Sequence, residues 1–300
     1  EVIASGPTRR RAGQRAFVQA TPAASPEAIP VSGDPVPALA AFDAVMQQAM
    51  AAWAIPGGQL SLAKDARLVY RRGFGLASRE DAEPVLPTHR FRIASSTKGI
   101  TGVGILKLID DGALALETPV FPLLGFDGPI DASFDARLNV ITVQDLLVHA
   151  GGWDSAGTGF DPQYTPWPQM AAHVLGEADP ADAETIVRWM RSQPLDFDPG
   201  TKSSYSNFGF NVLGRVIERV SGQPYEVWMQ DNLFTPAGIT SMAIGGVTLA
   251  QRMPHEVRYY QQPDLPPAPS VYAGDGFVPL AYGSFFLRAL DAHGGYIATS

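Results

Sequence analysis

The sequence predicts a mixed fold of the α/β type, in the α+β arrangement, and two observations support this prediction. Two short β-type runs, Gln59 to Ala63 and Leu68 to Phe74, are separated by the turn segment Lys64 to Arg67 in a hairpin pattern. Residues 118–221 instead show helical patterns joined by long loops, with no convincing strand. Strands that pair locally in one part of a chain, with helices in another, are typical of the α+β class.

The composition fits a globular protein and argues against two kinds of partner. The 300 residues are 45% hydrophobic and 17% charged, enough chain for one large domain or two smaller ones. A net charge of -8 argues against nucleic acid and against an anionic membrane, because both attract faces rich in Lys and Arg. No apolar run approaches the roughly 20 residues that span a bilayer. Because the chain has no cysteine, disulfides, thiolate catalysis and zinc-thiolate sites are excluded.

Residues 1–36 differ from the rest in being rich in Ala, Pro, Ser and Arg, with Arg9-Arg10-Arg11 near the start. This composition predicts a disordered leader or linker. The alternative is the remnant of an export signal, which would require an apolar stretch after the arginines, and none is visible. The compartment, periplasmic or secreted on the one hand and cytoplasmic on the other, therefore stays open.

The first predicted helix, residues 38–54, precedes the hairpin. Its apolar stripe is formed by Leu39, Phe42, Val45, Met46 and Met50, and Pro56-Gly57-Gly58 ends it. After the hairpin and a polar loop, the run 91–93 leads into a second helix over residues 96–111, with Gly112 as its C′ residue. Its predicted core face consists of Ile100, Val103, Leu106 and Ile109, with Ile105 as a further candidate.

Three glycines, Gly99, Gly102 and Gly104, weaken this second helix, which indicates that another element packs closely against it. Three further helices are predicted at 142–149, where Thr142 is the cap, at 182–192 and at 205–220, with Gly222 just past the end of the last one. The Pro- and Tyr-rich residues 254–279 have no periodicity, so we expect an ordered loop or a mobile flap there.

Ser95 and Lys98 lie three residues apart at the start of the second predicted helix, a spacing that places both side chains on one helix face. A hydroxyl beside an amine becomes nucleophilic if the amine is partly neutral, and burial lowers the pKa of a lysine far enough for that. The helix N-terminus also offers free N–H groups and a positive dipole end to a developing oxyanion. We therefore interpret Ser95 as a candidate nucleophile.

Tyr205 and Asn207 lie two residues apart where the helix 205–220 begins. The Tyr205 phenol can exchange protons if a nearby cation lowers its pKa from about 10. The Asn207 carboxamide can hydrogen-bond a carbonyl or amide of a substrate. Together with Ser95-x-x-Lys98, this second motif forms the set of candidate site residues.

These motifs resemble those of the serine β-lactamase and penicillin-binding protein superfamily. The resemblance is to the Tyr-x-Asn branch, which includes class C β-lactamases, D-alanyl-D-alanine carboxypeptidases and β-lactamase-like carboxylesterases. Class A enzymes carry Ser-Asp-Asn at this point, and this chain does not. The resemblance covers roughly residues 38–300, and its blocks are Phe91 to Ser95, Leu146 to Gly152, Tyr205 to Gly214 and Ser221-Gly222.

The resemblance implies an antiparallel sheet flanked by helices, a mostly helical second domain and an active site in the cleft between them. It implies that Ser95 is acylated, that Lys98 takes part in activating it, and that Tyr205 accepts and donates protons alongside Lys98. Asn207 would hold the acyl side of the substrate, and the Ser95 N–H would form half of an oxyanion hole. We expect residues 37–94 to form the first part of the α/β domain and residues 95–300 the helical domain with loop insertions.

One departure from this family concerns its third motif, Lys-Thr-Gly, His-x-Gly or a relative on a late strand. The segment His293-Gly294-Gly295 has the letters of His-x-Gly. However, the residues that follow it, 296–300, look like a family segment that lies well upstream of that late strand. We therefore expect the remaining C-terminal strands of the α/β domain to lie beyond residue 300.

Each candidate also has a purely structural interpretation. Without the second motif, Ser95 would be interpreted as an N-cap. Ser96 is the other candidate nucleophile, but the residue three positions after it is Gly99 and not a lysine. We interpret His149 as structural. Trp153 either lines an acyl pocket, as a substrate-binding residue, or belongs to the core of the helical domain.

The sequence thus predicts a serine hydrolase without a metal or other cofactor, acting on a small-molecule ester or amide. Carboxylic esters are favoured, because the aromatic and proline-rich loops indicate an apolar pocket. The first alternative is a β-lactamase or D-alanyl-D-alanine peptidase. An alternative of another class is a non-catalytic member that binds a ligand in the same cleft.

Overall fold

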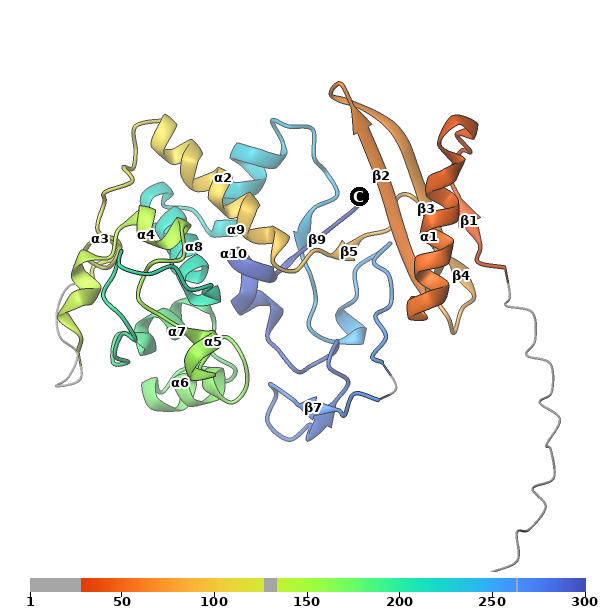
Figure 1. Ribbon diagram of the computed structural model, residues 1–300. Helices are drawn as coiled ribbons and strands as arrows, with labels where there is room; N and C mark the ends of the chain where they lie inside the picture. Colours follow the sequence, from red (N-terminus) through yellow and green to blue (C-terminus); the bar gives the residue numbers. More distant parts are fainter. Residues whose placement is uncertain (1–27, 127–133, 263) are drawn as a thin grey trace, which may run out of the picture.

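The computed structural model of the protein describes residues 28–126, 134–262 and 264–300. It has an antiparallel sheet at one end and a group of helices at the other, with a small second sheet between them (Figure 1). This is the mixed α/β architecture that the sequence predicts.

The larger sheet has the order β1–β3–β2, with β4 paired to β3, and all pairings are antiparallel. The predicted hairpin is confirmed, since β2 and β3 pair over most of their length. Asp65 and Ala66 form its turn with φ of 51° and 57°, the left-handed conformation that tight hairpins favour. The strands are β1 (Val31–Ser32), β2 (Gly57–Lys64), β3 (Arg67–Ser78) and β4 (Glu83–Pro84).

The sheet begins earlier than the sequence indicates. Val31 pairs with Phe74 and Ser32 with Gly73, so part of the segment assigned to a leader or linker is a strand. The local signal was weak because a two-residue strand has no periodicity. Residues 1–27 of that assignment lie outside the described residues.

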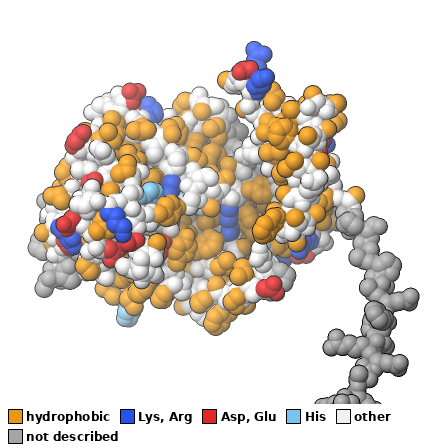
Figure 2. Space-filling model, in the orientation of Figure 1, with side chains coloured by type: hydrophobic (Ala, Val, Ile, Leu, Met, Phe, Trp, Pro, Cys, Tyr) orange, Lys and Arg blue, Asp and Glu red, His pale blue; other side chains and the backbone are white. Residues whose placement is uncertain are grey.

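Helix α1 (Ala40–Trp53) follows a short turn of 3-10 helix, η1 (Pro37–Leu39), and packs on the sheet. Its Met50 side chain is buried with Tyr70 and Phe74. The predicted apolar stripe is wrong in part, because Val45 is 60% exposed and Phe42 is also exposed. Figure 2 shows apolar side chains gathered at this end of the molecule.

A three-stranded antiparallel sheet joins this part to the helices. Its order is β5 (Phe91–Arg92), β9 (Tyr296–Ala298) and β6 (Ala243–Ile244), so it brings the segment before Ser95 beside the last residues of the chain. The aperiodic segment 254–279 is largely loop, and it contains β7 (Ala268–Pro269), which pairs with β8 (Phe277–Val278).

The helical part is built around α8 (Asn207–Ser221), most of whose residues are buried among neighbouring helices. Two predicted helix ends are confirmed in this part. Thr142 forms a capping box with Asp145 at the start of its helix, and Gly222 ends α8 at φ 71°. The helices are α2 (Ser96–Asp110), α3 (Val120–Leu123), α4 (Val143–Leu147), α5 (Ser155–Thr158), α6 (Trp167–Leu175), α7 (Ala183–Met190), α8 (Asn207–Ser221), α9 (Tyr225–Met229) and α10 (Asp291–Gly294). Shorter helical turns are η2 (Ala136–Val140), η3 (Gln230–Phe234), η4 (Leu249–Gln251) and η5 (Leu287–Leu290).

The core face of α2 differs from the predicted one. Ile105 is buried and Ile100 and Ile109 pack against the core, as predicted, but Val103 and Leu106 are about half exposed. The buried face also contains Lys98, Thr101, Gly104 and Leu108. The reason is that this face is partly polar. Thr101 Oγ1 hydrogen-bonds Tyr225 Oη and the Ala292 carbonyl, each at 2.6 Å, and hydropathy alone does not reveal such a pairing.

Within the described residues, no helix has the length and apolar character that a membrane crossing requires.

Candidate active site

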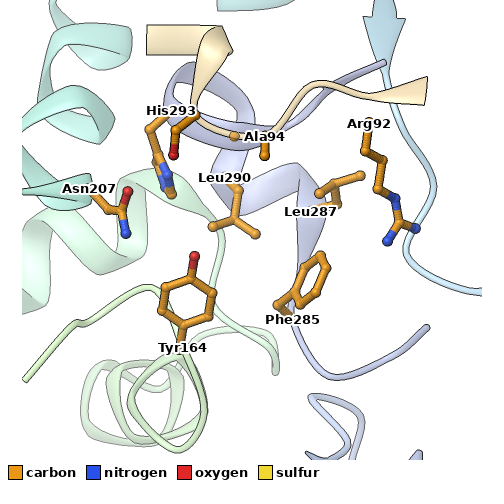
Figure 3. A pocket seen from close by; sticks show the side chains of 10 residues that line it. Arg92, Ala94, Tyr164, Asn207, Phe285, Leu287, Leu290 and His293 are labelled. Carbon is orange, nitrogen blue, oxygen red and sulfur yellow. The ribbon is translucent and has the colours of Figure 1, made fainter. Parts of the chain in front are cut away.

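A cavity of about 120 Å³ lies where the start of α2 meets the start of α8, the loop before α6 and the segment 285–294. Figure 3 shows Asn207 from the start of α8, Tyr164 from the loop before α6 and Leu290 from the segment 285–294 directed toward it. The lining residues are Arg92, Ala94, Ser95, Tyr164, Asn207, Phe285, Leu287, Leu290, His293 and Gly294.

The backbone turns sharply between β5 and α2, immediately before Ser95. Ala94 has φ 45°, a left-handed conformation that is unusual for a residue with a Cβ and costs about 1–3 kcal/mol. The N–H groups of Ser96 and Thr97 donate to carbonyls of this turn. The N–H of Ser95 donates to no backbone carbonyl among the described residues, so it is available to a ligand.

The three residues that the sequence singled out for proton transfer lie together. Ser95 Oγ accepts a hydrogen bond from Tyr205 Oη at 2.7 Å and another from Lys98 Nζ at 3.2 Å. The Lys98 ammonium nitrogen also lies 4.8 Å from the centre of the Tyr205 ring. A hydroxyl, an amine and a phenol from positions up to 110 residues apart thus share one site.

Lys98 is 5% exposed, and its other hydrogen bonds go to Asn207 Oδ1 at 2.7 Å and to the His293 carbonyl at 2.9 Å. Burial lowers the pKa of Lys98 below its usual 10.5, because a buried ammonium loses its hydration. Tyr205 and the carboxylate of Asp161 oppose this effect on the pKa only in part. Lys98 is therefore easier to deprotonate than a surface lysine.

Tyr205 is half exposed, and its ring packs against His149 with ring centres 4.8 Å apart. His149 Nδ1 accepts the N–H of Ser206, the residue between Tyr205 and Asn207. Burial and the nearby Lys98 charge lower the pKa of His149, so the ring is held neutral. His149 thus fixes the backbone of the Tyr205-x-Asn207 motif and touches the Tyr205 ring, in agreement with a structural role.

The two expected substrate-binding residues lie in different places. Asn207 is the first residue of α8 and lines the cavity (Figure 3). Trp153 is 4% exposed and packs against Phe121 and Phe208 in the helical core. Trp153 therefore belongs to the core of the helical domain and does not line the cavity.

Several residues near the cavity have no motif in the sequence. Asp161 accepts a hydrogen bond from Asn207 Nδ2 at 2.7 Å, and the Tyr164 phenol points into the cavity. Partial desolvation raises the pKa of Tyr164 to about 12, with the Asp161 charge adding to the effect. The only local signal for either residue is a loop rich in aromatic and proline residues, which does not distinguish site residues from core.

His293 lies in α10 and not on a strand, so it does not take the place of the family's third motif. Its side chain is almost fully buried beside the cavity, and burial with the Lys98 and Arg215 charges lowers its pKa well below 6.5. His293 contributes to the site through its backbone, as the acceptor for Lys98.

Comparison with known proteins gives a consistent result. Residues 42–300 match the sequence model of the protein family described as Beta-lactamase. The chain is 33% identical over 227 residues to Esterase EstB of Burkholderia gladioli, an alignment that covers 72% of this chain and 54% of that protein. It is 32% identical over 195 residues to a putative D-alanyl-D-alanine carboxypeptidase of Escherichia coli O157:H7, covering 62% and 42%. The chain spans about half of the length of these relatives.

Solved structures show the same fold. A penicillin-binding protein homologue from Pyrococcus abyssi, described as octameric, superposes with a TM-score of 0.61 at 23% identity, covering 87% of this chain and 53% of that one. EstCE1, described as a hydrolase with promiscuous acyltransferase activity, superposes with a TM-score of 0.60 at 23% identity, covering 86% and 68%.

Proposed function

Because the chain belongs to the beta-lactamase family, whose hydrolases include its esterase relative, we propose that it is a serine hydrolase that forms an acyl-enzyme on Ser95 and hydrolyses carboxylic esters. The observation that carries the proposal is the contact of Ser95 Oγ with both Lys98 Nζ and Tyr205 Oη. A serine used only as an N-cap has no need of two proton-transfer groups.

In the proposed acylation, Ser95 Oγ attacks the ester carbonyl while its proton passes to the neutral amine of Lys98. The lowered pKa of Lys98 favours this step, because the amine must be free to accept a proton. The tetrahedral oxyanion develops near the free N–H of Ser95 and the N-terminus of α2.

Collapse of the tetrahedral intermediate breaks the bond from the carbonyl carbon to the leaving alkoxide. Tyr205 Oη, which lies 2.7 Å from Ser95 Oγ, gives its proton to that alkoxide and regains one from the Lys98 ammonium. A water molecule then attacks the acyl-enzyme through the same groups in reverse, which releases the acid and restores Ser95.

The lining of the cavity supports an ester over a substrate with a free carboxylate. Phe285, Leu287 and Leu290 form an apolar wall. Arg92 is the cation that lines the cavity among the described residues, and its guanidinium already donates to the carbonyls of Gly246 and Ala281. Its charge is further balanced by Glu256, whose carboxylate lies 3.9 Å away.

A second candidate is the hydrolysis of β-lactams or D-alanyl-D-alanine peptides. It is supported by the relative named as a putative D-alanyl-D-alanine carboxypeptidase and by the Asn207 carboxamide in the cavity wall, which can bind a substrate amide. The chemistry at Ser95 is the same, so only the substrate separates the two candidates.

Covalent labelling tests the proposed nucleophile directly. We expect a fluorophosphonate to add to Ser95, as located by mass spectrometry of the peptides, and we expect Ser95→Ala to lose the label. Ser96→Ala is the matched control, since it removes the neighbouring hydroxyl and should keep the label. A folded protein that stays unlabelled at Ser95, but is thermally stabilised by an ester analogue, would instead indicate the non-catalytic ligand-binding member.

Turnover of two substrates separates the candidates. We expect hydrolysis of p-nitrophenyl esters of short acids and little or none of nitrocefin. Rapid nitrocefin turnover, or a stable adduct with a fluorescent penicillin, would favour the second candidate.

A further inference from the structure

We propose that Asp161 is a positioning residue of the Ser95 site, which fixes the carboxamide of Asn207 so that the oxygen of that group, and not its nitrogen, faces Lys98. The inference deepens the proposed function and rests on it for the role of Lys98. Asp161 lies in the loop between α5 and α6, far from both motifs in sequence.

A chain of hydrogen bonds connects Asp161 to the site. Lys98 Nζ donates to Asn207 Oδ1 at 2.7 Å, and Asn207 Nδ2 donates to Asp161 Oδ2 at 2.7 Å. The other carboxylate oxygen, Asp161 Oδ1, accepts the backbone N–H of Gln163 at 3.1 Å. Each oxygen of Asp161 thus has its own donor, which holds the carboxylate in place.

The number of protons on a neutral amine explains why this orientation matters. A neutral Lys98 has two N–H groups and one lone pair. Asn207 Oδ1 and the His293 carbonyl are two acceptors within 2.9 Å of Lys98 Nζ, so they take both N–H groups. The lone pair is then left for the remaining neighbour, the Ser95 hydroxyl at 3.2 Å. This is the arrangement that a general base at Lys98 requires.

A flipped Asn207 would spoil this arrangement. Its NH₂ group would donate to the Lys98 lone pair and compete with the proton of Ser95. The two orientations of a carboxamide have almost the same shape, so packing does not distinguish them. The ionised carboxylate of Asp161 distinguishes the two orientations, because it only accepts hydrogen bonds and therefore needs the donor atom, Asn207 Nδ2, to face it.

Asp161 also acts on Lys98 as a charge. Its negative charge favours the ammonium form and opposes the effect of burial on the Lys98 pKa. Burial raises the pKa of Asp161 itself, while the hydrogen bonds from Asn207 and Gln163 oppose that change. The other titratable groups that face Lys98 are the Tyr205 phenol, which favours the ammonium, and the His149 and His293 rings, whose pKa values are lowered.

The first test reads the charge of Lys98 without using activity. The chain has four lysines, Lys64, Lys98, Lys107 and Lys202, so ¹³Cε-labelled lysine gives four NMR signals that a Lys98→Met spectrum assigns. We expect Asp161→Asn to lower the titration midpoint of Lys98 by about one pH unit, because it removes a nearby negative charge. Asp110→Asn is the matched control: it removes the same charge from the exposed end of α2 and should leave the midpoint unchanged. An unchanged midpoint in Asp161→Asn would overturn the inference.

The second test asks whether Asp161 acts through Asn207. We expect Asp161→Asn to slow fluorophosphonate labelling of Ser95 by about 10-fold, the effect of losing one charge-assisted hydrogen bond. At a pH above the Lys98 titration midpoint, where Lys98 is neutral in every variant, the same substitution in an Asn207→Ala background should have no further effect on the labelling rate, because the group that Asp161 positions is gone. Independent, multiplicative losses would contradict the inference.

The two tests also separate this inference from the proposed function. If Asp161→Asn shifts the Lys98 midpoint but the wild-type protein takes no label on Ser95, the role of Asp161 at Lys98 stands and the proposed hydrolase activity fails. If Ser95 is labelled, but Asp161→Asn neither shifts the Lys98 midpoint nor depends on Asn207 for its effect, the hydrolase proposal stands and the role of Asp161 fails. Thermal unfolding of each variant checks that the isosteric Asp161→Asn change leaves the protein folded.

Discussion

Lys98 is a basic side chain that the fold buries without a carboxylate in contact with its amine. Its Nζ is satisfied by a hydroxyl, a carboxamide oxygen and a backbone carbonyl. None of the ion pairs among the described residues includes it. Neutral acceptors stabilise an ammonium less than a carboxylate does, so the desolvation effect prevails and the pKa falls.

The pH dependence of acylation should reflect this lowered pKa. Protonated Lys98 cannot accept the Ser95 proton, so the rate of Ser95 labelling should be low in acid and should rise with pH through a midpoint below 10.5. Burial lowers the pKa values of His149 and His293 below 6.5, so neither ring accounts for a rise in rate at alkaline pH. A rate profile governed by a group near 6.5 and abolished in His149→Gln would contradict this assignment to Lys98.

Helix α2 carries three glycines that were predicted to mark close packing, and only one of them does so. A methyl group on Gly104 would lie 2.8 Å from Sδ of Met229 and 3.3 Å from Cδ1 of Ile217. A methyl group on Gly102 would make only an ordinary contact, and one on Gly99 would meet nothing within 4 Å. Close approach of α8 and α9 to α2 therefore depends on Gly104.

Substitution at these positions should have opposite effects on stability. Gly104→Ala should lower the free energy of unfolding by about 1–3 kcal/mol, since the added carbon overpacks the contact with Met229. Gly99→Ala, in the same helix, should raise it by up to about 1 kcal/mol through helix propensity. Urea unfolding of the two variants measures both values, and a neutral Gly104→Ala would show that the Met229 side chain moves aside at no cost.

The helices and the small sheet are held together by a buried ion-pair cluster. Arg215 of α8 is 7% exposed and pairs with Asp291 at 2.6 Å and with Glu218 at 2.8 Å. Asp291 begins α10, which carries the His293 carbonyl and leads into β9. The cluster thus connects the helical part to the site and to the strand beside β5.

Removal of one partner from this cluster should be costly. Asp291→Ala leaves the buried Arg215 charge with Glu218 as its remaining ion-pair partner among the described residues, and we expect a loss of about 3–5 kcal/mol in the free energy of unfolding. Glu177→Ala is the control, because it breaks the exposed pair with Arg188 and should cost no more than about 1 kcal/mol. Equal losses in urea unfolding would mean that the cluster is not effectively buried.

At the scale of the whole molecule, the sequence predicted the mixed architecture, the hairpin, and helix ends such as Thr142 and Gly222. It also predicted which residues to examine at the site, and the structure brings Ser95, Lys98 and Tyr205 together. It did not predict β1, the polar part of the buried face of α2 or the loop residue Asp161. Each of these depends on a partner distant in sequence, as Val31 does on Phe74 and Asp161 on Asn207.

Local chemistry accounts for this division. Turn conformation, helix capping and the spacing of Ser95 and Lys98 are decided by residues a few positions apart, so the sequence by itself determined them. Whether Lys98 is charged is decided by burial and by acceptors as far away as His293, 195 residues along the chain. Those distances exist only once the chain has folded, so the tertiary structure alone decided which of the motif residues share one environment.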